Sequence, residues 1–369
     1  MQRTPLFDCH RTAGAKLVDF AGWEMPIQYS GVLDEYHAVR AKAGLFDVSH
    51  MGRIAVSGEG ALSFLQQVTT NDVATLPLMQ AHYSMVCNHQ GGIKDDIFIY
   101  HLKPNKYLLC VNASNQEKIL GWLREEVRRL TGCTIVDQSA TLAQVALQGP
   151  ASRDLLSRMG VPGIASLKLR HCLETTLAGI ACLIARTGYT GELGYELYAP
   201  ADGIADLWRA LLDHGSPAGL KPTGLGARDL LRLEMAYLLY GNDIGEDTTP
   251  LEAGVEWAVS FQKGDFIGRE ALQKQKEAGL TRRFMAFELL EKGVPRHGFK
   301  IVKPGPTGEI IGEVTSGNLS PLLQKGIGLG YVPPALAQPG ASFVIDIRGK
   351  SMPAIVVKPP FYRKPRANG

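Results

Sequence analysis

A change of pattern between residues 275 and 283 constrains the fold of this chain more than any other feature. Beyond it, short runs alternate between apolar and polar residues, and glycine and proline turns separate them. Alternation with a period of two is typical of strands that bury one face, and a series of short strands favours a small β-barrel or β-sandwich. The predicted strands are 284–289, 310–315, 327–332, 342–347 and 353–358.

Helical and strand-like periods are interleaved before this boundary, which indicates mixed α and β structure. The predicted helices are 31–44, 59–67, 115–130, 150–159, 202–213 and 226–239, and the predicted strands are 53–57, 82–87, 96–101 and 107–112. Gly44 and Gly241 are the expected ends of the first and last helices. A chain of 369 residues exceeds what one hydrophobic core usually serves, so two or three domains are expected.

The helix at 115–130 begins with a sequence typical of a capping box, because Ser114 and Glu117 have the S-x-x-E spacing. Its charged residues are expected to form a solvated face; they are Arg124, Glu125, Glu126, Arg128 and Arg129. We therefore expect no binding patch on this helix.

Composition excludes several classes of protein. A net charge of +3 is too small to indicate nucleic-acid binding, although it would suit an acidic partner or a polyanionic small ligand. The six cysteines show no spacing typical of a zinc site and are expected to be free thiols in a reducing cytosol. No signal or transit peptide and no run of eighteen apolar residues is found, so we expect a cytoplasmic enzyme without a membrane span.

Two polar or glycine-rich segments lie in the first hundred residues. Residues 19–26 (DFAGWEMP), followed by 46–52 (FDVSHMG), combine aromatic, methionine and acidic side chains that could line a pocket or form packed loops. In GGIKDD at 91–96, Asp95 and Asp96 should point to opposite sides of a strand. One acid could orient or protonate an amine while the other faces outward or pairs with the neighbouring lysine; a plain hairpin turn is the alternative.

Two further segments follow in the second half. In RTGYTGELGYE at 186–196, Glu196 could accept two hydrogen bonds from an aminopyrimidine-type edge, although a hairpin turn would also explain the glycines. Arg228, at a predicted helix start, suits a bound carboxylate or polar heterocycle, or else a surface pair with an adjacent aspartate. The glycines of 326–330 indicate strand packing, since no helix follows them. The residues alone therefore indicate an α+β protein with a pocket.

Taken in order along the chain, these segments resemble the aminomethyltransferase (T protein) family of the glycine cleavage system. The motifs are DFAGWEMP, FDVSHMG, TTND at 69–72, GGIKDD, RTGYTGELGYE, GLGARDLLRLE at 224–234 and SGNLSP at 316–321. The resemblance implies a multi-domain α+β folate-binding fold with a C-terminal β-barrel. It also implies the domain limits 1–52 with 140–278, an inserted region 53–139, and a barrel 279–369.

The resemblance implies a chemistry as well. Tetrahydrofolate would receive a methylene carbon from the aminomethyl-dihydrolipoyl arm of the H protein, giving 5,10-methylenetetrahydrofolate and ammonia without a metal. Asp96 would be the catalytic acid near the reacting nitrogens, with Asp95 the weaker candidate, and Glu196 and Arg228 would anchor the pterin. The other implied folate contacts are Met51, Tyr83, Asn112, Tyr189 and Arg363, the last toward the glutamyl tail or a neighbouring loop.

Two related families provide alternatives. Folate-dependent demethylases of the same superfamily would keep the pterin site, but the complete DFAGWEMP and FDVSHMG motifs favour the glycine-cleavage family. A non-catalytic folate-binding family carries a cysteine in a K-G-C-x-x-G-[QR]-E loop. Here residues 263–270 read KGDFIGRE, with Asp265 in place of that cysteine. This difference argues against the non-catalytic family.

Overall fold

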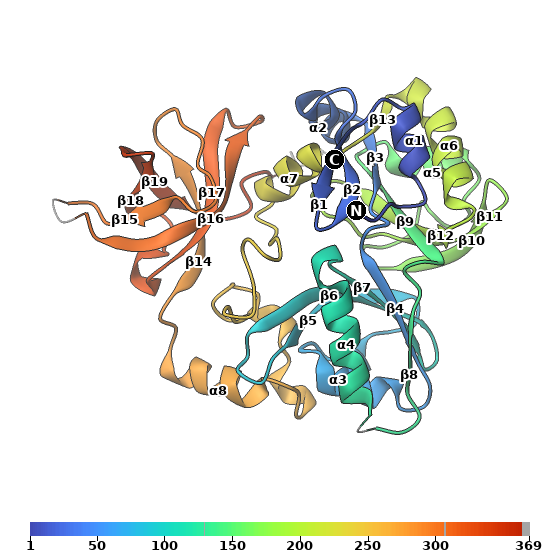
Figure 1. The fold of residues 1–369 in the computed structure, drawn as a ribbon, viewed down its shortest axis with the longest axis horizontal. Coiled ribbons are helices and arrows are strands. Elements are labelled where there is room, and N and C mark those ends of the chain that lie inside the picture. The colour runs from blue at the N-terminus through green and yellow to red at the C-terminus, as the bar shows by residue number, and fades with distance from the viewer. Residues whose placement is uncertain (129, 306–307, 364–369) are drawn as a thin grey trace. The chain divides into compact units, whose positions relative to one another are not determined.

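The computed structural model describes residues 1–128, 130–305 and 308–363 (Figure 1). Contacts divide the chain into two compact units. The first comprises Met1–Val86, Lys94–Asp229 and Gln262–Phe266. The second comprises Cys87–Ile93, Leu230–Phe261 and the described residues from Ile267 onward.

A six-stranded sheet with strand order β10-β11-β12-β9-β3-β13 forms the centre of the first unit. Its strands are β3 (Ala43–Asp47), β9 (Leu142–Gln148), β10 (Cys172–Leu177), β11 (Ile180–Ala185), β12 (Gly194–Pro200) and β13 (Leu220–Pro222). Only β13 and β3 pair in parallel; the other paired strands are antiparallel. The helices α5 (Ser152–Arg158) and α6 (Ile204–Gly215) share one apolar core with this sheet (Figure 1). Full burial of a large side chain such as Trp208 contributes about 1.5–3 kcal/mol.

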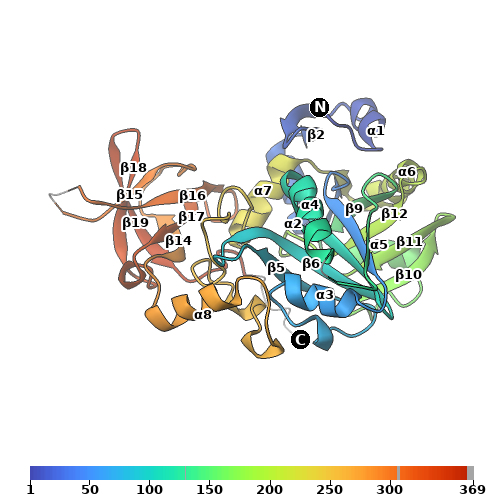
Figure 2. The same cartoon turned by 60° about the horizontal axis from the view of Figure 1, so that its bottom comes forward.

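A second sheet has five strands in the order β5-β6-β7-β4-β8, and its β6–β7, β7–β4 and β4–β8 pairs are antiparallel. Its strands are β4 (Gly52–Ser57), β5 (Gln80–Cys87), β6 (Ile93–Lys103), β7 (Lys106–Val111) and β8 (Thr134–Asp137). The helices α3 (Ala61–Val68) and α4 (Gln116–Val127) lie together beside it (Figures 1 and 2). Phe98 and Tyr100 of β6 pack with Ala185 and Tyr198 of the six-stranded sheet, so the two sheets share a second apolar core.

The N-terminal segment contains α1 (Phe7–Thr12), the hairpin β1 (Lys16–Phe20) and β2 (Trp23–Gln28), and α2 (Val32–Ala41). Ala21 and Gly22 form the hairpin turn with φ values of 52° and 83°. Positive φ at both turn positions is typical of two-residue turns whose twist matches the strands. The segment 19–26 is therefore mainly a hairpin, and the expectation that it forms a loop is wrong.

A closed barrel in the second unit has the strand order β14-β17-β16-β15-β18-β19. Its strands are β14 (Arg283–Leu289), β15 (Lys300–Val302), β16 (Ile310–Ser320), β17 (Lys325–Val332), β18 (Ser342–Ile347) and β19 (Lys350–Val357). The five predicted strands are confirmed, and the short β15 was missed. A Cβ atom at Gly328 would lie 2.4 Å from the Phe287 ring, which confirms that glycines in β17 serve strand packing. The helix α8 (Arg269–Ala278) precedes the barrel.

Two helix ends differ from the sequence prediction. Helix α2 ends at Ala41, and Gly44 lies in β3, where a Cβ atom would approach Val39 to 2.4 Å. Helix α7 (Leu225–Glu234) ends before Gly241, after which the chain forms turns. In both cases the glycine serves tertiary packing or a later turn rather than the helix end.

Helix α4 starts within one residue of the predicted limit, but the capping box predicted there is wrong. Asn115 precedes the helix, and Ser114 lies in the 3₁₀ turn Ala113–Asn115, so the capping box is not formed. Glu126, expected on a solvated face, is buried. The predicted position of Arg129 lies outside the described residues. Among the described helices, none is long and apolar enough to cross a membrane.

Candidate active site

The predicted site residues of the first unit are all partly exposed to solvent. Each is partly buried, neither sealed in a core nor fully solvated; they are Met51, Tyr83, Asp96, Asn112, Tyr189, Glu196 and Arg228. Partial burial is what a ligand-lining side chain requires, because it must be both held by its neighbours and reachable. Arg363 belongs to the second unit and is exposed, so its contact with a folate tail stays a prediction.

Three neighbouring strands assemble the acidic end of the site. The Tyr83 hydroxyl in β5 donates to Asp96 Oδ2 in β6 at 2.9 Å. The Asn112 amide, directly after β7, donates to Asp96 Oδ1 at 2.8 Å. Burial, and next the charge of Asp96, raise the pKa of Tyr83 well above its usual value, so the phenol keeps its proton. Two neutral donors therefore orient the Asp96 carboxylate without neutralising it.

Asp95 takes a different position from the one expected. Its carboxylate is fully buried and accepts hydrogen bonds from Asn112 Nδ2 at 2.8 Å, from the Asn112 backbone at 3.0 Å and from Asn115 Nδ2 at 2.6 Å. The expectation that the second acid faces outward is therefore wrong. Burial, and next the charge of Asp96, raise the pKa of Asp95 above its usual range, while the asparagine amides oppose this shift. Asp95 is thus a buried support of Asn112, which in turn orients Asp96.

Glu196 in β12 lies at the other end of the site. Gln144 Nε2 donates to Glu196 Oε1 at 3.0 Å, the Thr187 hydroxyl donates to Oε2, and the Tyr100 hydroxyl lies 3.4 Å from the same oxygen. Tyr100 and Asp96 share one face of β6, because they are four residues apart. Four residues of strand span roughly 13 Å. The rigid strand β6 therefore fixes the separation between Asp96 and the Tyr100 hydroxyl that contacts Glu196.

Arg228 lies in the first turn of α7 and packs on an aromatic ring. Its guanidinium carbon is 4.8 Å from the centre of the Tyr189 ring, within the range of a cation–π interaction. Burial lowers the pKa of Arg228, while the nearby Tyr189 and Glu196 oppose that shift. Arg228 is thus within electrostatic range of Glu196. The segment 186–196 and the start of α7 therefore contribute to the same site.

Gln148 holds the loop between β11 and β12 and was missed from the sequence. Its amide donates to the Thr187 carbonyl at 3.2 Å and accepts from the Thr190 hydroxyl at 2.9 Å. A Cβ atom at Gly188 or Gly194 would lie 2.0 or 2.3 Å from this amide. The signal was present as two glutamines in the otherwise apolar run LAQVALQ, since buried amides need defined partners.

We expect Gly194→Ala to destabilise the chain by about 1–3 kcal/mol, because the added methyl group must displace the fully buried Gln148 side chain. Urea unfolding measures the change. Gly121→Ala is the matched control: Gly121 lies inside α4, and apart from its own helix backbone no described atom lies within 4 Å of the place its methyl group would take, so alanine should stabilise by roughly 0.5–1 kcal/mol. Equal stability of Gly194→Ala and the wild type would contradict the packing argument.

His50 is a buried neutral residue beside these groups. Its ring lies edge-on to Phe20, with centroids 5.6 Å apart, and its Nδ1 makes no hydrogen bond to the described residues. Burial is the largest cause that lowers the pKa of His50 to about 3; the charge of Asp47 opposes the shift, and the charges of Arg228 and Arg53 contribute to it. His50 therefore stays uncharged near neutral pH and cannot serve as a proton donor in its imidazolium form.

No group of three or more His, Cys, Asp or Glu side chains suitable for a metal ion occurs within residues 1–128, 130–305 and 308–363. The site consists of carboxylates held by amide and hydroxyl donors, together with one guanidinium over a ring. Such a set can orient a polar heterocycle and stabilise positive charge near Asp96.

Comparison with known proteins gives full-length matches. Residues 6–263 match the GCVT N-terminal domain, and residues 282–363 match the glycine cleavage T-protein C-terminal barrel domain. An aminomethyltransferase of Halothermothrix orenii is 50% identical over 98% of this chain and 100% of that protein. An aminomethyltransferase of Phocaeicola vulgatus is 45% identical, covering 98% and 99% of the two chains.

A solved structure agrees with the sequence matches. The crystal structure of the glycine cleavage system aminomethyltransferase T from Bartonella henselae superposes with a TM-score of 0.91 at 35% identity, covering 98% of each chain. The predicted α+β fold with a C-terminal barrel is thereby confirmed. The chain belongs to the glycine cleavage T-protein family of aminomethyltransferases.

Proposed function

We propose that this chain transfers the methylene carbon of an aminomethyl group from the dihydrolipoyl arm of the H protein to tetrahydrofolate. The products are 5,10-methylenetetrahydrofolate, ammonia and the dihydrolipoyl H protein. The observation that carries the proposal is the placement of two carboxylates along one face of β6, each oriented by neutral donors: Asp96 lies on that face, and Glu196 of β12 lies beside Tyr100 on the same face. The family to which the chain belongs supports the same activity.

The residues around Glu196 fit the pterin of tetrahydrofolate. A carboxylate offers about four acceptor sites, and the described donors to Glu196 are Gln144, Thr187 and Tyr100. One acceptor site is therefore left for an N–H donor of an aminopyrimidine edge, and a ligand that displaces the long 3.4 Å contact of Tyr100 gains the second. Tyr189, with Arg228 over its ring, provides a flat polarised surface for a heterocycle. Met51, which packs against the apolar cluster that contains Tyr100, adds apolar contact on the same side.

Asp96 would act at the reacting end. Tetrahydrofolate supplies the nucleophilic nitrogens that take the methylene carbon. The Asp96 carboxylate, held by Tyr83 and Asn112, would accept a hydrogen bond from a folate N–H and stabilise positive charge as ammonia leaves. Because Asp96 lies roughly 13 Å along β6 from Tyr100, a pterin bound at Glu196 would direct its linker nitrogen toward Asp96.

We further propose the domain limits 1–52 with 140–278, 53–139, and 279–369, which the three sheets support: residues 52–137 contain the five-stranded sheet and residues 283–357 contain the barrel. Arg363 would contact the glutamyl tail of the folate or a neighbouring loop. The proposal places the enzyme in the cytoplasm, where its six free cysteines would stay reduced.

Ammonia release tests the proposed function. The chain is mixed with aminomethylated H protein and tetrahydrofolate, and ammonia and 5,10-methylenetetrahydrofolate are measured together; we expect both in equal amounts. Reactions without folate, or with H protein that carries no aminomethyl group, are the controls. Release of neither product, together with demethylation of a methylated glycine in the presence of folate, would instead support a demethylase.

Replacing Glu196 with alanine should weaken tetrahydrofolate binding by about 10- to 100-fold, because hydrogen bonds to a charged group contribute about 1.5–3 kcal/mol. Arg228→Ala should weaken it in the same direction. Titration calorimetry measures the affinity. Glu174→Ala, which removes a half-exposed carboxylate from the edge strand β10, is the matched control and should bind normally. Unchanged affinity in the Glu196 and Arg228 variants would reject the pterin anchor.

A further inference from the structure

Gln144 is a fully buried amide whose two polar ends are both engaged. Its Nε2 donates to Glu196 Oε1 at 3.0 Å, and its Oε1 accepts from the Cys110 thiol at 3.6 Å. A thiol donates only to the oxygen end and a carboxylate accepts only from the nitrogen end, so the amide has one favourable orientation. Gln144 in β9 pairs with Tyr198 in β12, which makes it the diagonal neighbour of Glu196 on the same sheet face.

Gln144 orients Glu196 without neutralising it. The hydrogen bonds that the described residues make to this carboxylate come from an amide and two hydroxyl groups, all neutral. An arginine or lysine at position 144 would form an ion pair and compete with the N–H donors of a ligand. An amide instead fixes the carboxylate plane and leaves its charge available, which is what recognition of a two-donor edge requires.

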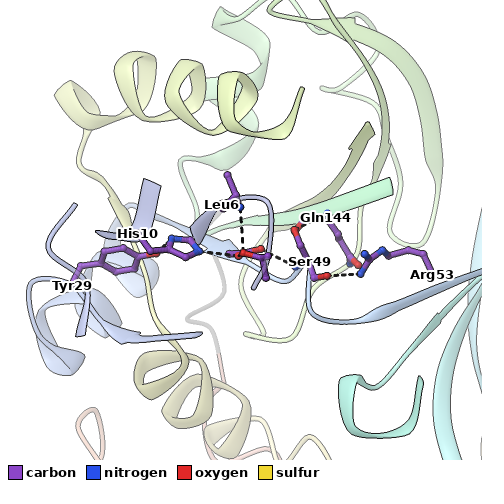
Figure 3. A network of polar contacts seen from close by, with 8 residues as sticks. Leu6, His10, Tyr29, Ser49, Arg53 and Gln144 are labelled. Atoms are coloured by element: carbon purple, nitrogen blue, oxygen red, sulfur yellow. Dashed lines mark hydrogen bonds and ion pairs between the residues drawn. The ribbon is translucent and has the colours of Figure 1, made fainter. Parts of the chain in front are cut away.

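The backbone of Gln144 is itself clamped by a buried polar network (Figure 3). The Ser49 hydroxyl donates to the Gln144 carbonyl at 2.9 Å and accepts from the Gln144 amide nitrogen at 3.1 Å. The Ser49 backbone nitrogen donates to Asp47 Oδ1 at 2.8 Å. Asp47 Oδ2 accepts from Thr4 at 2.6 Å and bonds His10 Nε2 at 2.8 Å. The position of Gln144 is thus fixed from the N-terminal segment of the chain.

We propose that Gln144 is a positioning residue for folate binding: its side-chain amide sets the orientation of the Glu196 carboxylate toward the pterin edge, and the Ser49–Asp47–His10 network holds the Gln144 backbone in place. The inference rests on the proposed function, since it assigns Gln144 a role in the same site. Gln144 acts through Glu196 and does not itself contact the reacting atoms.

The test is tetrahydrofolate affinity of Gln144→Glu and Gln144→Leu as a function of pH. In Gln144→Glu two carboxyl groups lie side by side, so one pKa of the pair rises. At pH 6 the protonated carboxyl can donate to its partner as the amide does; at pH 8.5 both are ionised and repel. We expect binding near the wild-type affinity at pH 6 and at least tenfold weaker, relative to the wild type, at pH 8.5. Gln144→Leu should bind about 10- to 100-fold more weakly at both pH values.

Few other groups could produce this pH dependence. Within the described residues, the ionisable groups whose pKa responds to the charge of Glu196 are Tyr100, Tyr198, Cys110, Cys172 and Arg228. Burial raises the pKa of both thiols to about 12 and that of both phenols well above their usual value. Arginine keeps its proton throughout this range. A pH response that is confined to Gln144→Glu therefore reports the introduced carboxyl.

Steady-state kinetics separates positioning from catalysis. In Gln144→Leu the rise in KM for tetrahydrofolate should exceed the fall in kcat, because Asp96 is untouched. Thermal unfolding of each variant identifies any loss of fold, and the low-pH recovery of Gln144→Glu stays informative even if Gln144→Leu does not fold. Wild-type affinity in a folded Gln144→Leu, or a Gln144→Glu affinity that follows the wild-type pH curve, would overturn the inference. Failure of the wild type to bind tetrahydrofolate would reject the proposed function instead.

Discussion

Asp96→Asn should lower the turnover of aminomethyl transfer by about 10²–10⁴-fold, the usual contribution of a positioned acid–base group. Asparagine is nearly isosteric, and its carbonyl can still accept from Asn112 while the Tyr83 hydroxyl turns to accept from the new amide. The local hydrogen bonds can therefore persist while the negative charge is lost. Folate affinity should change little, because Glu196 and Arg228 are intact. Ammonia release measures turnover, and titration calorimetry measures binding.

Asp95→Asn distinguishes the two adjacent acids. Asp95 is fully buried and hydrogen-bonded by Asn112 and Asn115, so its replacement should reduce stability more than it reduces the rate of a folded enzyme. A loss of turnover in Asp95→Asn equal to that in Asp96→Asn, at unchanged melting temperature, would assign the role to Asp95. Near-normal turnover in Asp96→Asn would move it away from this strand.

Acidification from pH 7.5 to pH 4 should cost roughly 3 kcal/mol of unfolding free energy through His50 alone. Burial lowers the pKa of His50 to about 3, whereas the unfolded imidazole titrates near 6.5. Between these values the unfolded state binds the extra proton, so stability falls as the pH falls. Burial also lowers the pKa of His82 to about 4, which adds a loss of the same sign. Urea unfolding across this range measures the sum.

Substitution of single histidines separates the contribution of His50 to the pH dependence of stability. His50→Gln should flatten the stability curve between pH 6.5 and 4, while His214→Gln, at an exposed position of α6, should leave its slope unchanged. Asp47 acts at lower pH: burial opposes its ionisation, but hydrogen bonds from His10, Thr4 and Ser49 lower its pKa to about 2, so its contribution is lost only below about pH 4. A wild-type slope in His50→Gln would show that His50 is not the responsible group.

The apolar and polar pattern of the sequence was sufficient to predict most strands of the barrel. The barrel strands are short apolar runs separated by glycine and proline turns, and all five predicted ones appear within a few residues of their limits. Helix ends were less predictable. Gly44 resembles a helix-ending glycine, but it is needed in β3 because a Cβ atom there would collide with the Val39 side chain. The short strand β15 has only three residues, Lys300–Val302, too few to show a period.

Some residues of the candidate site could be predicted from the sequence and others could not. Asp96, Glu196 and Arg228 lie in glycine-rich motifs that stand out in the sequence, and the resemblance gave them roles. Gln144 interrupts an apolar strand, which indicates a buried amide that needs partners, but the sequence does not identify those partners. Those partners, Ser49 and Glu196, are 95 and 52 residues away along the chain. No local period predicts a hydrogen bond that two distant strands form only after the sheet is assembled.

The contact of Gln148 with Gly188 and Gly194 has a consequence for directed evolution. Any side chain at either glycine collides with the glutamine amide, and any loss of the amide releases the Thr187 carbonyl and the Thr190 hydroxyl. The three positions therefore form one epistatic unit. A library that randomises them one at a time should return mostly the parental residues. Joint randomisation, with a shorter side chain at 148 and alanine or serine at 194, should recover folded loops with altered shapes and hence new ligand preferences beside the anchor.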